Sequence, residues 1–427
     1  MDSDRRGEEI APLIVSVEGS IPEFRQSKIH ARDVHILSLA FLFIFSAFGG
    51  VQNLQSTVNM GLGTTTLGIV YLSFALFSAV ASLVVRGLGS KGSLILGTTG
   101  YLLYIASNLK PSWYTMVPAS LYLGFTSSII WVGQGTYLTS AARSHAKGWQ
   151  LHEGIVIGKF NGEFWCSFAS TQVIGNLISL LLLKDEKGGS SSGMSLLFTI
   201  FLVCVLLGSI MMCFLSKNSI VSSLKFLVVP LLEIRLLLLI PILSYYGLER
   251  AFVWAEYTKK IVKPALGLSG VGGAMAVYGA TNALCSLLAG WFTSGFSSIT
   301  VIVSIGSILQ IAVLLWILFG YSFSSGVLGI LMPLVIGAIW GVGDGVFSTQ
   351  LNALLGMLFK HDTEAAFAQM KLWQCTATAV VFFLSPVISL EAMTIVMLVA
   401  LCIALPSFLF LTLHVQKSNG TPYQVIS

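Results

Sequence analysis

One aspartate stands in a long stretch of the chain that carries no other charge. Asp344 lies in the sequence GDGVFST (343–349), and no Asp, Glu, Lys or Arg occurs over residues 264–343 or 345–359. At membrane depth an ionisable residue is costly, and it is found where it binds an ion, relays a proton or pairs with another charge. Asp344 is therefore our first candidate for ion or proton chemistry.

Lys371 and Glu163 are the charged residues that could act together with Asp344. In the helical spans predicted below, Asp344 lies ~18 Å and Lys371 ~12 Å from the cytosolic ends of consecutive spans, at 1.5 Å per residue. An Asp344–Lys371 pair would cost less than either charge alone. Glu163 is the counterpart of Lys371 in an internal repeat, so these two could meet across a cytosolic entrance. The alternatives are a structural bond and side chains that reach to the membrane interface.

A second polar group lies in the apolar segment 236–258. Glu249 and Arg250 are adjacent there, hence about 100° apart on a helix, and cannot simply neutralise one another. Amide residues occur at a comparable depth in the first apolar segment of the chain: Gln52, Asn53 and Gln55. Polar residues at matched depth suggest one half of a central cavity, and polar contacts that tie helices together are the alternative.

The composition places these residues in a membrane. Of 427 residues, 55% are hydrophobic and 10% charged, with a mean hydropathy of +0.86, whereas soluble domains carry about 25% charged residues. Because lipid leaves backbone groups unsatisfied and no alternating barrel pattern occurs, the spans must be helices of roughly 20 residues. We predict an all-α polytopic membrane protein with twelve spans: 34–55, 65–85, 92–109, 114–139, 160–183, 194–216, 236–258, 267–292, 298–320, 326–356, 363–386 and 392–415.

The basic residues orient these spans. Under this topology, the cytosolic segments hold more than twice as many Lys and Arg residues as the opposite side, so both termini are expected in the cytosol. A basic cluster at 259–263 opposes this orientation locally. Residues 1–33 have no apolar core followed by a cleavage site, so no cleavable signal is expected. The predicted parts are a cytosolic N-terminal tail (1–33), a six-helix half (34–216), a cytosolic connector (217–235), a second six-helix half (236–415) and a cytosolic C-terminal tail (416–427).

Several classes of protein are disfavoured. The six cysteines all fall within predicted spans without a Cys-x-x-Cys pair, and the six histidines lack metal-binding spacing. No nucleophile elbow, Walker loop or zinc signature occurs, so we expect no enzyme, no cofactor and no metal. The formal net charge of +5 fits the cytosolic positive bias and calls for no nucleic acid. The expected partners are the lipid bilayer and a small solute or ion.

An internal repeat relates the two halves. The sequence GQGTYLT (133–139) aligns with GDGVFST (343–349) at an offset of 210, in the fourth and tenth predicted spans. The following spans match at nearly the same offset, 208. Gln134 therefore occupies the position in the first half that Asp344 occupies in the second.

Two six-helix halves joined by a cytosolic connector are the arrangement of the major facilitator superfamily, in which the substrate path lies between parallel halves. The link RGLGSKG (86–92) is similar to the Gly-rich basic connector of that superfamily, but the usual aspartate is missing, which bears on any gating role. Trp131 and Trp340 precede the two repeat copies. Each could line the path or pack in a helix interface.

Residues 62–139 carry a more specific resemblance. They include Trp131 followed by Gln134-Gly135-x-Tyr137-Leu138-Thr139, and these further residues: Leu88-Gly89-Ser90-Lys91, Gly100-Tyr101, Tyr104, Asn108, Pro111, Trp113-Tyr114 and Pro118-Ala-Ser120. The stretch resembles the uncoordinated-93-like family, a divergent branch of the major facilitator superfamily, and looks like its plant members. The resemblance implies a transporter-like fold. It also implies a link to potassium homeostasis for plant members, and potassium-channel regulation or receptor escort for animal members.

Two functional hypotheses follow. The first is a secondary transporter of a small solute or ion, with Asp344 or Glu163 carrying a coupling proton and the spans 34–55, 114–139, 236–258 and 326–356 lining the path. The second is a regulatory subunit of a channel, or an escort of a receptor, that keeps the fold without transporting. Flux through the purified protein distinguishes the two.

The N-terminal tail contains a candidate sorting sequence. Glu9 is followed by Leu13 and Ile14, which is the spacing of an acidic dileucine signal, and Pro12 favours an extended backbone. Such a peptide offers a carboxylate and two aliphatic side chains to a sorting adaptor. It predicts a vacuolar or other endomembrane location; a chance match, and with it the plasma membrane, is the alternative.

Overall fold

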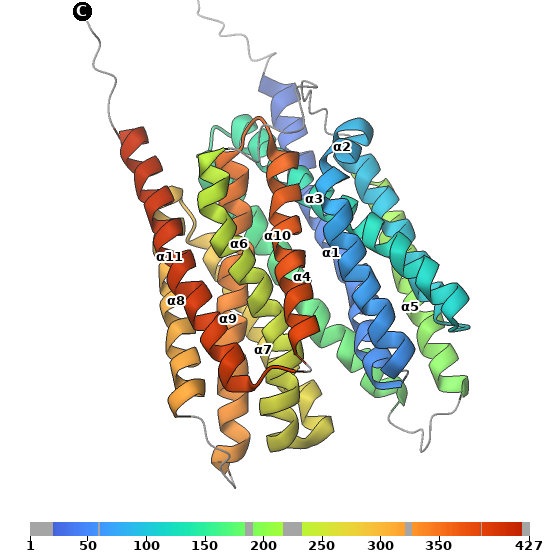
Figure 1. The fold of residues 1–427 in the computed structure, drawn as a ribbon. Coiled ribbons are helices and arrows are strands. Elements are labelled where there is room, and N and C mark those ends of the chain that lie inside the picture. Colours follow the sequence, from blue (N-terminus) through green and yellow to red (C-terminus); the bar gives the residue numbers. More distant parts are fainter. Residues whose placement is uncertain are drawn as a thin grey trace, which may run out of the picture.

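The protein is a bundle of long helices (Figure 1). The computed structural model describes residues 20–58, 60–183, 191–216, 233–320, 327–385 and 387–420. These residues form α1 (Ser20–Val58), α2 (Met60–Ser107), α3 (Trp113–Gly148), α4 (Glu153–Leu183), α5 (Ser191–Cys213), α6 (Ile234–Phe252), the π-helix η3 (Val253–Val262), α7 (Lys263–Trp291), α8 (Phe296–Phe319), α9 (Val327–Leu358), α10 (Thr363–Leu384) and α11 (Leu390–Gly420).

Within the described residues, nine helical stretches are long and apolar enough to cross a membrane. One of them, Thr65–Ser107, has 43 residues, about twice the roughly 20 that a single crossing needs. It bends at Gly89, whose φ of 72° lies in the left-handed region that favours glycine. This long helix therefore holds two predicted spans, 65–85 and 92–109.

The helices α4 and α10 are not among these nine stretches. Both carry polar and charged residues, including Glu163 in α4 and Lys371 in α10. The all-α membrane fold is confirmed, whereas the count of twelve crossings stays a prediction at these two helices.

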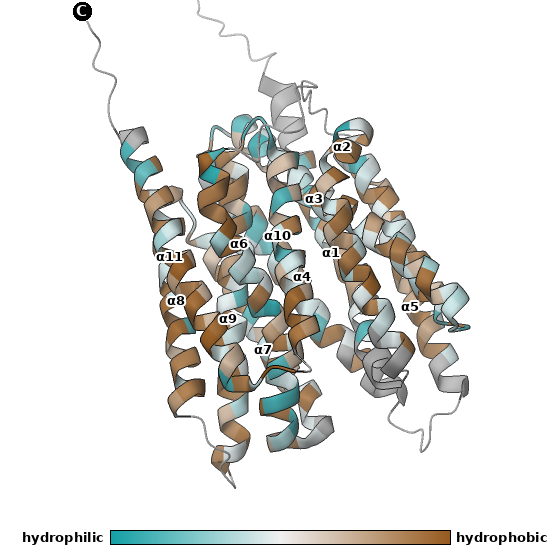
Figure 2. Ribbon diagram, in the orientation of Figure 1, coloured by the Kyte–Doolittle hydropathy of each residue, from teal (hydrophilic) through white to brown (hydrophobic). Residues whose placement is uncertain are grey.

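The outer faces of the bundle are apolar. Hydrophobic residues colour much of α5, α8 and α11, while hydrophilic segments lie toward the middle of the bundle and near the loops (Figure 2). Large apolar side chains on the outside include Phe319 and Val387, each 81% exposed. A water-facing surface would not retain so many such side chains, so these faces contact lipid.

At the centre of the bundle, helices from the first part of the chain pack against helices from the second part. The helix α10 packs on α2 and α3, and α4 packs on α7 and α9. Small residues allow the close approach of α4 and α7: a methyl group added to Gly162 would lie 2.8 Å from the Cα atom of Gly290, closer than carbon atoms pack. The predicted division into halves at 217–235 falls mostly outside the described residues and stays a prediction.

The beginning of α1 and the end of α11 lie at the same face of the bundle (Figure 1). We call this the tail face. It agrees with an even number of crossings, and its assignment to the cytosol rests on the distribution of basic residues. The sorting residues Glu9, Leu13 and Ile14 lie outside the described residues.

Candidate functional site

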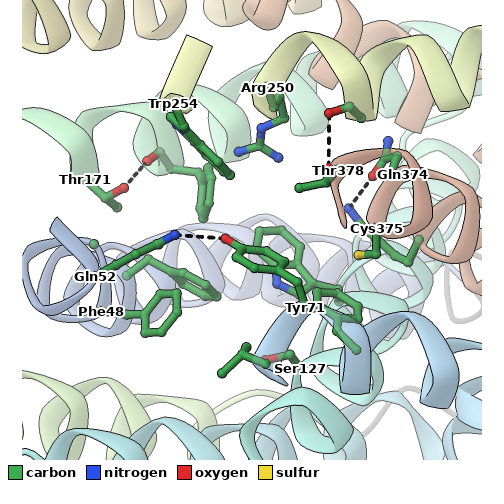
Figure 3. A pocket seen from close by; sticks show the side chains of 18 of the residues that line it. Phe48, Gln52, Tyr71, Ser127, Thr171, Arg250, Trp254, Gln374, Cys375 and Thr378 are labelled. Carbon is green, nitrogen blue, oxygen red and sulfur yellow. Dashed lines mark hydrogen bonds between the residues drawn. The ribbon is translucent and has the colours of Figure 1, made fainter. Parts of the chain in front are cut away.

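A cavity of about 100 Å³ lies at the centre of the bundle, between α1–α4 on one side and α6, η3 and α10 on the other. Figure 3 shows Arg250 and Trp254 facing Gln52 and Tyr71 across it, with Gln374, Cys375 and Thr378 at one end. Aromatic rings form much of the remaining wall. The polar and charged residues that line the cavity are Gln52, Tyr71, Tyr101, Ser127, Thr171, Gln172, Arg250, Lys371, Gln374 and Thr378.

Asp344 pairs with Arg250. The guanidinium Nε of Arg250 lies 3.8 Å from Asp344 Oδ1, and Asp344 Oδ2 accepts hydrogen bonds from the Tyr278 hydroxyl at 2.6 Å and from the Asn282 amide at 2.5 Å. The Asp344 side chain is buried and does not line the cavity. The carboxylate therefore holds Arg250 in place without itself lining the cavity.

The predicted Asp344–Lys371 pair is wrong. Consecutive spans do not have to turn the same faces toward each other: α9 packs mainly on α7 and α8, whereas α10 packs on α2 and α6. This packing turns the Lys371 side chain away from Asp344 and toward the first half of the chain. The cation that reaches Asp344 comes instead from α6, as Arg250.

Lys371 lies against two indole rings. Its ammonium nitrogen is 4.6 Å from the ring centre of Trp131 and 5.8 Å from that of Trp165, and it donates a hydrogen bond to Gln374 Oε1 at 3.3 Å. The negative faces of the rings attract the cation. Among the described residues, no carboxylate forms a salt bridge with Lys371.

Glu163 does not meet Lys371, so that prediction is also wrong. Its carboxylate lies 3.8 Å from His35 Nδ1 on α1, and 24% of the side chain is exposed. The repeat gives Glu163 and Lys371 equivalent positions on α4 and α10. The two helices pack against equivalent neighbours, α4 on α1 and α7 and α10 on α6 and α2. Glu163 lies near His35 of α1, however, whereas Lys371 lies against Trp131 and Trp165.

Glu249 points away from Arg250, as the angle between adjacent helical residues predicts. It is fully buried and accepts a hydrogen bond from the Gln310 amide, whose oxygen accepts in turn from the Tyr245 hydroxyl. It does not line the cavity. Glu249 thus joins α6 to α8, and the proposal that it lines a cavity together with Arg250 is corrected.

Of the amide and tryptophan candidates, some line the cavity and others do not. Gln52 lines the cavity and donates to the Tyr71 hydroxyl at 3.0 Å, and Trp131 lines it beside Lys371. Trp340 is fully buried against Phe252. Gln134 is fully buried too, and neither of its amide atoms has a hydrogen-bond partner among the described residues.

Neither Gln134 nor Trp340 lines the cavity, and Trp340 packs in a helix interface, which was the alternative for this residue. The side chain of Gln55 lies outside the described residues. Sequence reasoning missed Gln374 and Trp254, although Gln374 follows Lys371 by three residues and Trp254 follows Arg250 by four. Residues at these spacings share a helix face, which is the pattern that could have found them.

At the tail face, ion pairs join the first part of the chain to the second. Arg86 lies 2.9 Å from Asp362 and 3.8 Å from Glu364. Arg86 opens the Gly-rich link at 86–92, so this link contacts α10 although its usual aspartate is missing. Such pairs hold α2 against α10 on this side of the cavity.

A second group of charges lies nearby on the tail face. Glu153 accepts from Arg143 at 3.1 Å and from Lys360 at 2.8 Å, and Arg143 also donates to the Lys360 carbonyl at 3.1 Å. Burial alone would raise the pKa of Glu153, but the hydrogen bond and charge of Lys360 and the charge of Arg143 outweigh it and lower this pKa. The group joins α3 and α4 to the end of α9.

The part of the chain that the structure describes contains no group of three His, Cys, Asp or Glu side chains that could hold a metal ion. The site therefore offers charge, hydrogen bonding and aromatic surface. These properties suit the binding of a solute, because a mostly apolar and aromatic wall with a few polar and charged groups is typical of ligand pockets.

Solved structures with a similar fold are transporters. A crystal structure of the major facilitator superfamily transporter FucP in the outward conformation matches with a TM-score of 0.65 and 11% identity, over 88% of this chain and 98% of that one. A bacterial homologue of the iron transporter ferroportin, in an outward-facing state, matches with a TM-score of 0.65 and 13% identity, over 89% and 99%. These likenesses establish the fold alone.

Sequence comparisons identify the family. The chain is 60% identical over 413 residues to UNC93-like protein 3 of Arabidopsis thaliana, covering 93% of this chain and 89% of that protein. It is 28% identical over 424 residues to the putative potassium channel regulatory protein unc-93 of Caenorhabditis elegans, covering 88% and 60%. The family profile described as "Ion channel regulatory protein UNC-93" matches residues 55–410, and the chain belongs to this UNC-93 family.

Proposed function

We propose that the protein is a secondary transporter of a small solute or ion. The observation that carries this proposal is the central cavity, whose polar and charged lining comes from α1–α4 and from α6 and α10. In transporters of this fold, the substrate path lies between the two halves, and rocking of one half against the other opens it to each side in turn. A cavity lined by helices from both the first and the second part of the chain supports this proposal.

The ion pairs of the tail face supply one gate in this proposal. Arg86 with Asp362, and Glu153 with Arg143 and Lys360, join helices that would separate when the tail face opens. Asp344 is the candidate coupling group. If a proton binds to Asp344, the carboxylate no longer attracts Arg250, and Arg250 is released to bind a solute in the cavity.

Flux through the purified protein tests this proposal. The full chain is reconstituted into sealed vesicles, and the uptake of a panel of salts and small solutes is measured, potassium first. We expect uptake of at least one solute that empty vesicles lack and that Asp344→Asn abolishes. Lys159→Gln is the matched control, because Lys159 is an exposed residue of α4 outside the cavity, and uptake should be unchanged.

A regulatory subunit of a channel is the second candidate. It is favoured by the description of the family as ion channel regulatory protein and by the name of the C. elegans relative. Absence of flux for the whole panel, together with a channel that co-purifies from native membranes, would replace the transporter proposal with this one. A role in potassium homeostasis fits either candidate.

The compartment is part of the proposal. We place the protein in a vacuolar or other endomembrane, with both termini in the cytosol, because the tail carries the Glu9, Leu13 and Ile14 spacing. A tagged variant with both Leu13→Ala and Ile14→Ala should move to the cell surface. An unchanged distribution would leave the tail without a sorting role.

A further inference from the structure

Among the residues that the structure describes, two cations and no carboxylate line the central cavity. Arg250 and Lys371 both contribute to its wall. The nearby acids are turned elsewhere, since Asp344 lies behind Arg250 and Glu249 bonds to Gln310 on α8. One of the two positive charges therefore has no acidic partner among the described residues. A bound anion would supply the missing negative charge in a setting where water screens charges weakly.

The same wall has more hydrogen-bond donors than acceptors to satisfy them. The amide nitrogen of Gln374 is buried without an acceptor among the described residues. The Tyr71 hydroxyl accepts from Gln52, which leaves its own proton free to be donated. The hydroxyl of Thr378 already donates to a backbone carbonyl. A ligand with several acceptor oxygens would satisfy the free donors.

The arrangement in space brings these donors together. Figure 3 shows the Arg250 guanidinium group pointing into the space between the Gln52–Tyr71 pair and Gln374. Lys371 bonds to the oxygen of that same Gln374 amide, so the ammonium group lies at the Gln374 end of the cavity. A guanidinium group offers two parallel N–H donors, which match the two oxygens of a carboxylate or of an inorganic oxyanion.

We propose that the central cavity binds a small oxyanion or carboxylate, held by Arg250, Lys371 and Gln374. Its volume of about 100 Å³ is below the roughly 300–1,000 Å³ of pockets for drug-sized ligands, which favours a small ligand. A potassium ion does not fit this chemistry, because it binds to rings of acceptor oxygens. The role of the anion as cargo rests on the transporter proposal, whereas its binding does not.

Binding to the purified full chain in detergent tests the inference. The midpoint of thermal unfolding is measured with sodium nitrate, acetate, phosphate and sulfate, each titrated at an ionic strength held constant with sodium chloride. At least one of these anions should raise the midpoint of the wild-type protein in a saturable manner. If none does so, the proposal is overturned.

Variants locate the binding. Lys371→Gln should raise the dissociation constant by about ten- to a hundredfold, because a hydrogen bond to a charged group is lost. Lys371→Arg should restore much of the affinity, and Lys159→Gln should leave it unchanged. If Lys371→Gln does not fold, Gln374→Leu replaces it, with an expected loss of about two- to tenfold. Binding that neither variant weakens would overturn the proposal.

Two further measurements separate this inference from the transporter proposal. Anion binding without flux in vesicles would reject transport and keep the anion site. Flux of a cation or neutral solute by a protein that binds none of the four anions would keep transport and reject the anion site. A third outcome would also reject the anion site: potassium chloride stabilises the protein more than sodium chloride does, and Lys371→Gln increases this difference. The cavity would then hold a cation.

Discussion

The α3 and α9 copies of the internal repeat share their small residues but differ in charge. In α9, the central residue is Asp344, which bonds to Arg250, Tyr278 and Asn282. In α3, the equivalent residue is Gln134, which is buried without a hydrogen bond to any described residue. The glycines that follow these residues also differ in packing: Gly135 lies against the Phe367 ring of α10, whereas Gly345 lies against the backbone of α7 at Asn282 and Ser286.

This difference shows how a duplicated fold can concentrate its charge in one half. Asp344 is surrounded by donors from α6 and α7, whereas the amide at the matching point of α3 has lost or never gained such partners. Lys371 of α10 then faces the first half, where the rings of Trp131 and Trp165 receive it. In the cavity, both cations therefore come from α6 and α10, and the rings that receive Lys371 come from α3 and α4.

The largest expected effect comes from removing the charge of Asp344. Asp344→Asn keeps the shape of the side chain but leaves Arg250 without its ion pair, and we expect a loss of about 3 kcal/mol in the free energy of unfolding. Thermal unfolding in detergent measures it. A midpoint within experimental error of wild type would show that the pair contributes nothing.

A double variant identifies the partner. Adding Arg250→Gln to Asp344→Asn should recover most of the lost stability, since the guanidinium charge that lost its partner is then removed as well. Adding Lys371→Gln should recover none of it, because Lys371 does not contact Asp344. Recovery by Lys371→Gln instead would mean that the two helices are turned differently from the arrangement described above.

The opposite sign is expected at the matching position of the first half. Gln134→Leu removes a buried amide that has no partner among the described residues, and it should raise the free energy of unfolding by about 1 kcal/mol, because an unsatisfied buried amide costs 1–3 kcal/mol. The same thermal measurement serves as the readout. A destabilisation similar to that of Asp344→Asn would abolish the contrast between the two repeats.

The smallest expected effect lies on the tail face, where both halves carry charges. The pKa of Glu153 is lowered in the folded protein, so its contribution to stability is present above its unfolded pKa of about 4.3 and is lost as the pH falls through the folded value. The contribution should stay below about 1 kcal/mol, because these side chains are partly exposed.

The pH dependence is measured against a matched variant. Between pH ~5 and ~3, the thermal midpoint of the wild-type protein should fall more steeply than that of Glu153→Gln, which cannot lose this charge. Parallel curves would mean that Glu153 does not link α4 to the end of α9 through its ionised form.

Much of the fold could be predicted because lipid imposes simple demands on a chain. Apolar runs of span length have to be helices, and the bend at Gly89 falls in the predicted link between two spans. The candidate site was predicted in part. One cavity is lined by four of the predicted residues: Arg250, Lys371, Gln52 and Trp131. They could be recognised because each interrupts an apolar helix with a polar or aromatic side chain.

The partners of these residues could not be predicted in the same way. Periodicity fixes which side chains share a face of one helix, but not which helix that face meets. Asp344 and Lys371 are close in sequence and at compatible depths, yet α9 and α10 pack against different neighbours. The contact between Glu163 and Lys371 failed for another reason: the repeat relates their positions, but it does not determine where each side chain points.

The sequence by itself determined that this protein lies in a membrane, and it also determined the helical spans, the internal repeat and the family resemblance. Each of these depends on composition or on spacing along the chain. The tertiary structure alone decided that Arg250 pairs with Asp344 and that Lys371 lies on Trp131. Such contacts depend on the rotation of each helix about its axis and on its neighbours. In a membrane these are set by side-chain packing between helices, which hydropathy along the chain does not record.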